Sequence, residues 1–515
     1  MPTGPHLFAE SGCKFSFVLP LWGGVLVRCV FTFVGAKSTV GTAQEAFNSG
    51  FAAAWAVFGA SIGFLLFGLF FVRKLYGSGE YTVSAAIAQK YGKSTMLTVS
   101  IIMIYALLLV NVGNYISGAA AISTVMKINL PVAICIIAVV STFYYVFGGL
   151  KGVANVTLLH TAMMVTGLGL ILGVALTATG GIRPMVESLP PSYFTWDGKI
   201  GVATIIAWTA GTMGAIFSTQ FIVQAISGSS SANKARRSTF YAAALCLPLG
   251  IALGLIGVAA RVLHPTMNSL YALPVFLQGM NPFLAGVVTT ALIASVFVSV
   301  STVALAIASL IVRDFYVPYF HPTPEQEFKT TRLLSLAIGV APLVFVFFVP
   351  AILKLSFFTR ALRLSISIVA LIGFYLPMFR SNRGATVGLL AAAVATTIWY
   401  ALGDPYGVNN MYIASATPIL VIGLEWLFGW QTRPPSPQRP QFWTVPAGLR
   451  PPLTTWPGPK PISPPSVCRT MLPTSCRCRT ATWPACGSVA RKRVPRTCRF
   501  MSLASRPARA NGRSR

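Results

Sequence analysis

Polar side chains interrupt an apolar stretch near the beginning of the chain, at residues 31–50. Lys37, Ser38 and Thr39 stand between two glycines there, and Gln44 follows about two helical turns later. The interior of a lipid bilayer holds no water, so such groups must find partners inside the protein or line a cavity. A helix that unwinds in mid-membrane exposes backbone carbonyls, which can replace the water shell of a small cation. We therefore expect a broken helix here, beside an ion or solute site.

A second interrupted stretch lies at residues 205–220, where Trp208 and Thr212 accompany Gly211 and Gly214. Each of the two stretches opens a block of five apolar segments. Interrupted helices at matching positions of two halves are typical of membrane transporters that are built from inverted repeats. The alternative is that the small residues only let neighbouring helices approach closely. The coincidence of polar residues and glycines in both stretches favours a central site.

Hydroxyl side chains cluster in a third apolar stretch, at residues 294–316. Ser295, Ser299 and Thr302 are spaced at i, i+4 and i+7, so they share one face of a helix. Such a row of oxygen atoms can complete a cation site. Each hydroxyl can instead bond the carbonyl four residues earlier in its own helix. Both interpretations stay open for this stretch alone.

The composition of the chain places these stretches in a membrane protein. Of the 515 residues, 55% are hydrophobic and only 10% are charged, and the mean hydropathy is +0.70. We predict an all-α integral membrane protein with about 12 transmembrane helices, because about 20 apolar residues suffice to cross the bilayer. After the interrupted opening segment, apolar runs lie at 51–72, 96–126, 129–147, 153–177, 200–226, 238–262, 284–312, 332–352, 361–379, 384–403 and 411–430.

Basic residues at alternate connections predict the orientation of these spans, since lysine and arginine concentrate in cytoplasmic loops. Lys354, Arg360 and Arg363 do not fit the alternation, which puts them outside. We place on the cytoplasmic side the connections at 73–93, 151, 234–237, 313–332 and 380–383.

The last part of the chain, residues 431–515, differs in composition from the rest. It holds 16 Lys or Arg, no Asp or Glu, and five of the nine cysteines. More than half of the net charge of +29 arises in this segment, and we expect no nucleic-acid partner. One interpretation is a disordered Pro- and Arg-rich tail that binds anionic lipid. The other, which the acid-free composition favours, is translation in a shifted reading frame.

Five motifs in one order resemble the sodium:solute symporter family, and the resemblance covers residues 27–430. They are VGAKSTVGTAQEAFNSGFAAAW, SGEYTVSAAIAQKYG, YYVFGGLKGVANVTLLHT, FIVQAISGSSSANKARR and SLIVRDFY. The resemblance implies a leucine-transporter-like fold, which is a five-plus-five inverted repeat with broken first and sixth core helices. An extra helix usually precedes that core, and residues 1–26 would hold it in truncated or garbled form.

The resemblance also implies a sodium site between the first and eighth core helices. Backbone carbonyls of Ala36, Thr39 and Ser295 would bind the ion, together with the hydroxyl of Ser299. The family usually has a second hydroxyl beside the last one, where this chain has Val298. One expected ligand is therefore missing.

Other departures concern charged and polar positions. Ser38 and Thr157 replace acidic residues of the family, and His160 replaces a glutamine. Lys37 lies beside the expected ion site, where an ammonium group would repel a second cation or take its place. Three interpretations of Lys37 stay open: a structural role that includes pairing with Glu45, coupling by protonation, or a neighbour without decisive effect. His160 is a weaker coupling candidate of the same kind.

Candidate solute contacts come from the first, third and sixth core helices. Asn111 and Asn114 lie one turn apart, and two amides on one face suit a polar organic solute. Hydrogen bonds between helices are the alternative for this pair. The full set of candidates is Ser38, Gln44, Asn111, Asn114, Tyr115, Trp208 and Thr212.

These observations predict a secondary active transporter of the cell membrane, of the bacterial inner-membrane type. It would import a small polar organic solute with sodium as the coupling ion, by alternating access. A proton-coupled carrier on the same fold is one alternative, and the transporter-like sensory domain of a histidine kinase is another. We expect no enzyme, because no cluster of acid, base and nucleophile and no phosphate-binding loop is present. The lipid bilayer is the expected surrounding.

Overall fold

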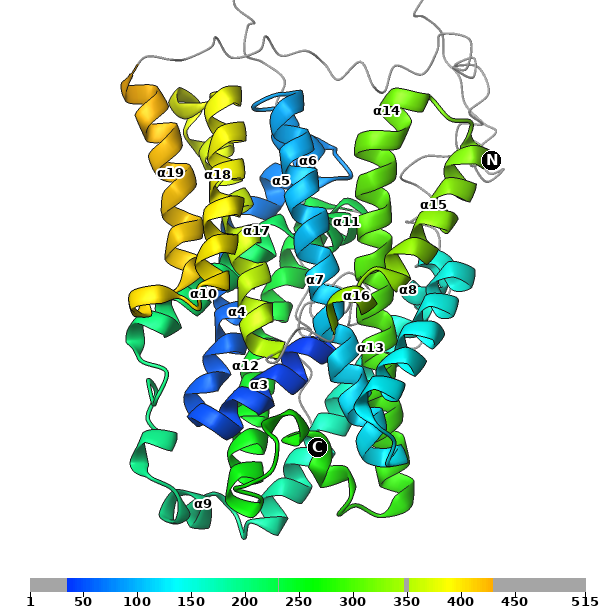
Figure 1. The fold of residues 1–515 in the computed structure, drawn as a ribbon, viewed down its shortest axis with the longest axis vertical. Coiled ribbons are helices and arrows are strands. Elements are labelled where there is room, and N and C mark those ends of the chain that lie inside the picture. The colour runs from blue at the N-terminus through cyan, green and yellow to red at the C-terminus, as the bar shows by residue number, and fades with distance from the viewer. Residues whose placement is uncertain (1–34, 230, 347–351, 429–515) are drawn as a thin grey trace, which may run out of the picture. The chain divides into compact units, whose positions relative to one another are not determined.

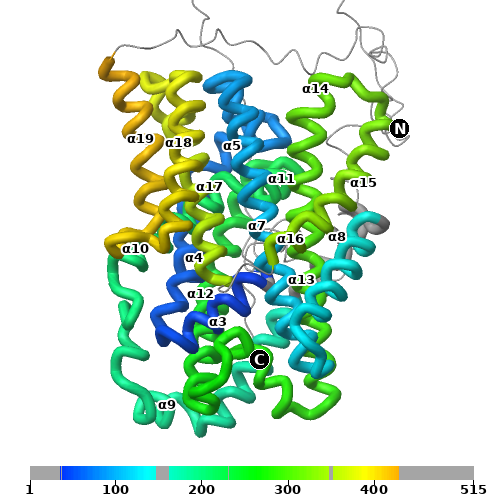
Figure 2. The backbone as a smooth tube through the Cα atoms, viewed as in Figure 1, coloured from blue at the N-terminus to red at the C-terminus, as the bar shows by residue number. Residues whose placement is uncertain are grey.

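The computed structural model describes residues 35–229, 231–346 and 352–428, although the side chains of Ala36 and of residues 147–161 lie outside this description. Within these ranges the chain forms helices and no strands (Figures 1 and 2). The predicted segments 1–26 and 431–515 fall outside the described residues.

The helices of the first half carry the first, second and third of the five sequence motifs. They are α3 (Ala36–Ser49), α4 (Trp55–Leu66), α5 (Val72–Ser78), α6 (Val83–Ala88), α7 (Lys93–Met126), α8 (Leu130–Ala178) and α9 (Ile182–Ser188). The second half contains α10 (Val202–Ser218), α11 (Gln220–Ser227), α12 (Ala232–Leu263), α13 (Pro282–Leu310), α14 (Val317–Phe320), α15 (Pro324–Val340), α16 (Leu343–Val346), α17 (Ile352–Tyr375), α18 (Asn382–Ala401) and α19 (Asn410–Leu427). Two π-helical segments, η3 (Phe67–Phe71) and η7 (Ile311–Tyr316), continue α4 and α13.

The structure confirms that the chain contains many apolar helices of membrane-spanning length. Among the described residues, eight helices are long and apolar enough to cross a membrane, or up to ten if each of two bent pairs is one span. The predicted spans 129–147 and 153–177 both fall in α8, a single element of 49 residues. A straight helix of that length would measure about 74 Å, more than twice the hydrocarbon thickness, so α8 is too long to be one straight span.

The predicted break in the sixth core helix is present within the interrupted stretch 205–220. α10 and α11 meet at Thr219, whose backbone is extended, and their axes differ by 47°. Gly211 and Gly214 lie inside regular α10, and the break lies at the end of the predicted stretch. A Cβ atom at Gly214 would lie 2.7 Å from the Cα atom of Leu364. The missing side chain at Gly214 therefore lets α17 pack closely against α10.

The interrupted opening stretch yields helix α3, which begins at Ala36 after Gly35. The half that would precede it lies in residues 1–34, outside the described set. α3 packs closely on α12, because a Cβ atom at Gly257 would lie 2.4 Å from the carbonyl oxygen of Ala43. Small residues at such a crossing let two backbones approach.

The loop pattern predicted that the basic connections lie on one side of the membrane. The described basic connections lie at one end of the helices. Arg73 donates to Asn233 over 3.4 Å, and the ammonium group of Lys93 lies 4.7 Å from the Tyr319 ring centroid. The segments α5, α6 and α14 lie at the upper end of Figure 1, and α9 lies at the lower end. The placement of Arg360 and Arg363 in an outside loop is wrong, because both lie buried in the middle of α17.

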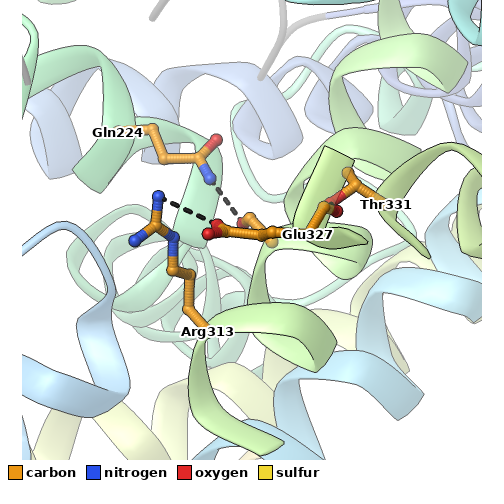
Figure 3. A network of polar contacts seen from close by, with 5 residues as sticks. Gln224, Arg313, Glu327 and Thr331 are labelled. Carbon is orange, nitrogen blue, oxygen red and sulfur yellow. Dashed lines mark hydrogen bonds and ion pairs between the residues drawn. The ribbon is translucent and has the colours of Figure 1, made fainter. Parts of the chain in front are cut away.

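Polar contacts join α11, α13, η7 and α15 (Figure 3). Arg313 forms an ion pair with Glu327 at 3.2 Å, and Thr331 donates to the carbonyl oxygen of Glu327 at 2.7 Å. The Gln224 amide donates to the Ser309 hydroxyl at 2.7 Å. The second half of the broken helix is thereby attached to α13.

Asp314 of η7 is a buried acid that neutral donors satisfy. It accepts hydrogen bonds from Thr82, Ser84 and Ser100, the first at 3.3 Å. A buried carboxylate is tolerated when several hydrogen bonds satisfy its oxygens. Asp314 therefore holds α6 and α7 against the end of α13.

The α3–α12 crossing predicts the effect of adding one methyl group. Gly257→Ala would place that group against the backbone of α3, and we expect it to destabilise the protein by about 1–3 kcal/mol through overpacking. The measurement is the unfolding temperature of the purified protein in detergent. Gly169→Ala is the matched control, since nothing lies within 4 Å of its added Cβ atom. Equal unfolding temperatures for the two variants would contradict this packing.

Candidate functional site

A cavity lies among helices that are far apart in the sequence. The start of α3 contributes Gly35, Lys37 and Ser38, and α7 contributes Val110 and Asn114. The remaining lining residues are Phe221 of α11 and Arg360 and Arg363 of α17. The cavity thus joins α3, α7 and α11, which correspond to the first, third and sixth core helices, with α17, which the sequence analysis did not include.

Lys37 is buried, with 7% of its surface exposed, and its side chain extends along α7. A Cβ atom at Gly113 would lie 2.8 Å from Cδ of Lys37, so this glycine makes room for the aliphatic stem. Among the described residues, the ammonium group of Lys37 has no ion pair and no hydrogen bond. Pairing with Glu45 is excluded, because the two lie about 12 Å apart along α3 and Glu45 accepts from Ser49.

Arg360 and Arg363 are the functional candidates that the sequence analysis missed. Arg360 donates to the carbonyl oxygen of Ala56 at 3.2 Å and to the hydroxyl of Thr212 at 2.7 Å. Arg363 donates from Nε to the Thr359 carbonyl at 2.9 Å. The signal that could have found both was their position inside an apolar run long enough to span the bilayer.

Thr219, at the break between α10 and α11, supplies a further acceptor. Its hydroxyl accepts from Nη1 of Arg363 at 2.8 Å. The described acceptors of Arg363 are a carbonyl and hydroxyls, so they orient its charge without neutralising it. The position of Arg363 therefore depends on the helix break.

The two predicted amides have different surroundings. Asn114 lines the cavity and donates to the side-chain oxygen of Asn111 at 3.1 Å. Asn111 in turn donates to the carbonyl oxygen of Val300 in α13, over 3.4 Å. Hydrogen bonding between helices therefore describes Asn111, whereas Asn114 faces the cavity.

Four other predicted solute contacts do not line this cavity. The Tyr115 hydroxyl donates to the Gly339 carbonyl at 2.8 Å, and the Trp208 ring stacks on Phe357 with centroids 4.3 Å apart. Thr212 holds Arg360, and Gln44 makes only a long contact of 3.5 Å with Ser269. Of the predicted set, Ser38 and Asn114 are the residues at the cavity wall.

The predicted ion ligands of α13 show two kinds of hydroxyl. Ser295 and Ser299 are buried, and neither hydroxyl has a hydrogen-bond partner among the described residues. Ser301 and Thr302 instead donate to carbonyls of their own helix, at 2.5 and 2.7 Å. Thr302 therefore does not belong with the other two, although it has the right spacing.

The structure describes the other predicted ion ligands and coupling residues only in part. Ala36 and Thr39 lie in the first turn of regular α3, where carbonyls normally accept from the N–H groups four residues later. Val298 is buried beside Ser299. The side chains of Thr157 and His160 lie outside the described residues.

Known proteins resemble the chain at the level of sequence. The chain is 26% identical over 305 residues to the human "High affinity choline transporter 1", which covers 55% of this chain and 52% of that protein. It is 23% identical over 316 residues to the "Sodium/proline symporter" of Haemophilus influenzae, covering 56% and 62%. The aligned part thus spans about half the length of the first of these relatives and somewhat more of the second.

Solved structures share the fold. A Na+-coupled sialic acid symporter superposes with a TM-score of 0.68 and 19% identity, covering 83% of this chain and 92% of that one. A nucleobase-cation-symport-1 family transporter gives a TM-score of 0.56 and 17% identity, covering 79% and 92%. Both support the leucine-transporter-like architecture and, with the apolar helices, a multi-pass membrane protein. Since the profile of the family described as "Sodium:solute symporter family" matches residues 28–391, the chain belongs to that family.

Proposed function

We propose that the chain is a secondary active transporter that moves a small polar organic solute together with sodium, by alternating access. The observation that carries the proposal is that the buried hydroxyls of Ser295 and Ser299 on α13 have no hydrogen-bond partner within the described part of the chain. A buried hydroxyl without a partner costs about 1–3 kcal/mol, so such groups are rare unless something binds them. A sodium ion is bound by oxygen atoms of this kind, and the family of the chain is consistent with this ion.

The contact between α3 and α13 supports coupling between ion and solute. α3 packs against α13, and its first residues line the cavity. An ion that orders the start of α3 would favour solute binding in the cavity, and the solute would favour the ion by the same factor. The break at Thr219 would act as a hinge, about which α11 moves relative to α10 during the transport cycle.

Proton coupling is the second candidate, and Lys37 is the observation that favours it. Lys37 is buried and has no described ion-pair partner, so loss and gain of its proton could follow the transport cycle. Vesicle uptake with imposed gradients separates the two candidates. Uptake that follows a proton gradient and ignores sodium would favour Lys37 as the coupling group and overturn sodium coupling.

Sodium should stabilise the purified protein even before its solute is known. We expect sodium chloride to raise the unfolding temperature in detergent above that in potassium chloride at equal ionic strength, because a ligand of the folded state stabilises it. Binding of radiolabelled sodium measures the same site directly. An identical unfolding temperature in both salts, with no bound label, would contradict the proposed ion.

Removing one unpartnered hydroxyl should weaken that sodium effect. We expect Ser299→Ala to lower sodium affinity about tenfold or more, since a ligand worth about 1.4 kcal/mol changes an equilibrium by that factor. Ser301→Ala is the control, because the Ser301 hydroxyl donates to its own helix. The readout is the sodium concentration at half-maximal stabilisation. Equal sodium affinities in the two variants would place the ion elsewhere.

A further inference from the structure

Three basic side chains meet at the cavity from two helices. Lys37, Arg360 and Arg363 have 7%, 2% and 3% of their surfaces exposed, respectively. Lys37 lies close enough to both arginines for their positive charges to repel its own. Such a cluster is unfavourable in a membrane interior unless negative charge accompanies it.

The described acidic residues do not provide that negative charge at the cavity wall. None of the eight described lining residues is a carboxylate. Asp314 is held by hydroxyls of α6 and α7, and Glu425 of α19 lies against Gly384. The ion pairs found among the described residues, such as Arg313 with Glu327, involve neither Lys37 nor Arg363.

Hydrogen-bond donors of Lys37 and Arg363 stay available to a ligand. A guanidinium group has five N–H donors and an ammonium group has three. Arg363 uses three donors on Thr359 and Thr219, one of them over a long 3.4 Å. Two donors of Arg363 and all three of Lys37 have no acceptor among the described residues. This set matches a carboxylate, which arginine binds through two parallel hydrogen bonds.

The rest of the cavity wall suits an organic rather than an inorganic anion. Ser38 and Asn114 add polar groups, whereas Val110 and Phe221 present apolar surface. The first turn of α3, which begins at the cavity, adds the positive end of a helix of 14 residues. A ligand with one charged end and a short apolar part would contact both kinds of surface.

We propose that the solute is a small organic carboxylate, bound between Lys37 and Arg363 with Arg360 as a third source of positive charge. This inference rests on the proposed transport function and names its solute class. The anion would neutralise the charges of Lys37 and Arg363, which form no ion pair among the described residues. A cation such as choline would be repelled there, and a neutral solute would leave the cluster charged.

Thermal stabilisation of the purified full chain tests the solute class. The probes are lactate and succinate, their neutral amides lactamide and succinamide, choline, and inorganic phosphate, all at constant sodium and ionic strength. We expect the carboxylates alone to raise the unfolding temperature. Stabilisation by the amides or choline equal to that by the carboxylates would overturn the inference. Stabilisation by phosphate alone would overturn the organic class as well.

Variants of the cavity cations test the site. We expect Lys37→Met to weaken carboxylate binding about tenfold or more, whereas Lys354→Met, at an exposed position of α17, leaves it unchanged. Arg363→Gln should act like Lys37→Met, and Arg363→Lys, which keeps the charge, should retain part of the affinity. Arg183→Gln, at a salt-bridged surface site, is the arginine control. Full carboxylate affinity in Lys37→Met and Arg363→Gln would place the solute elsewhere.

Sodium binding separates failure of this inference from failure of the proposed function. Stabilisation by sodium without any by carboxylates would leave the cation-coupled transporter standing and refute the solute class. Carboxylate binding that ignores both sodium and Ser299→Ala would support the cationic cavity and refute sodium coupling. Sodium stabilisation that persists in the cavity variants shows, in addition, that they are folded.

Discussion

The buried guanidinium groups of Arg360 and Arg363 impose the constraint on which the centre of the molecule depends. A charge inside a membrane protein must be hydrogen-bonded and accompanied by opposite charge. The acceptors come from α4 through Ala56, from α10 through Thr212, and from the helix break through Thr219. These hydrogen bonds attach α17 to α4, to α10 and to the helix break beside the cavity.

The same constraint separates two chemical environments on either side of α3. Toward α17 the cavity is cationic, with Lys37 facing the two arginines. Toward α13 the candidate ion site offers neutral oxygen atoms of Ser295 and Ser299. A sodium ion would therefore occupy the site of neutral oxygen atoms, and an organic anion would occupy the cationic cavity. Helix α3 would contact both ligands. That arrangement would explain how a cluster of lysine and arginines can coexist with the proposed sodium coupling.

Much of the fold could be predicted from the sequence, because hydropathy and the five motifs report the spans and the inverted repeat directly. The sixth-helix break could be assigned to residues 205–220, but not to one residue among them. The glycines at 211 and 214 that marked it serve the contacts of α10 with α19 and α17, while Thr219 breaks the helix. A glycine in an apolar stretch has the same appearance in either role, and only the neighbouring helix distinguishes them.

The site was predicted less completely, for a related reason. Lys37, Ser38 and Asn114 were found because polar residues stand out in apolar stretches, whereas Tyr115 and Trp208 point to partners on distant helices. Arg360 and Arg363 were placed outside because the apolar run was begun at residue 361, whereas α17 begins at Ile352 and holds both arginines in its interior. Residue type predicts that a buried polar group needs a partner, but the partner is fixed by the fold.

The affinity of the purified protein for sodium, measured with and without lactate, tests the account most directly. Because the two ligands would share α3, lactate should raise sodium affinity, and sodium should raise lactate affinity by the same factor. The effect should be absent with lactamide, which lacks the charge. Sodium affinity that does not respond to lactate, at lactate concentrations that saturate its own binding, would contradict the account.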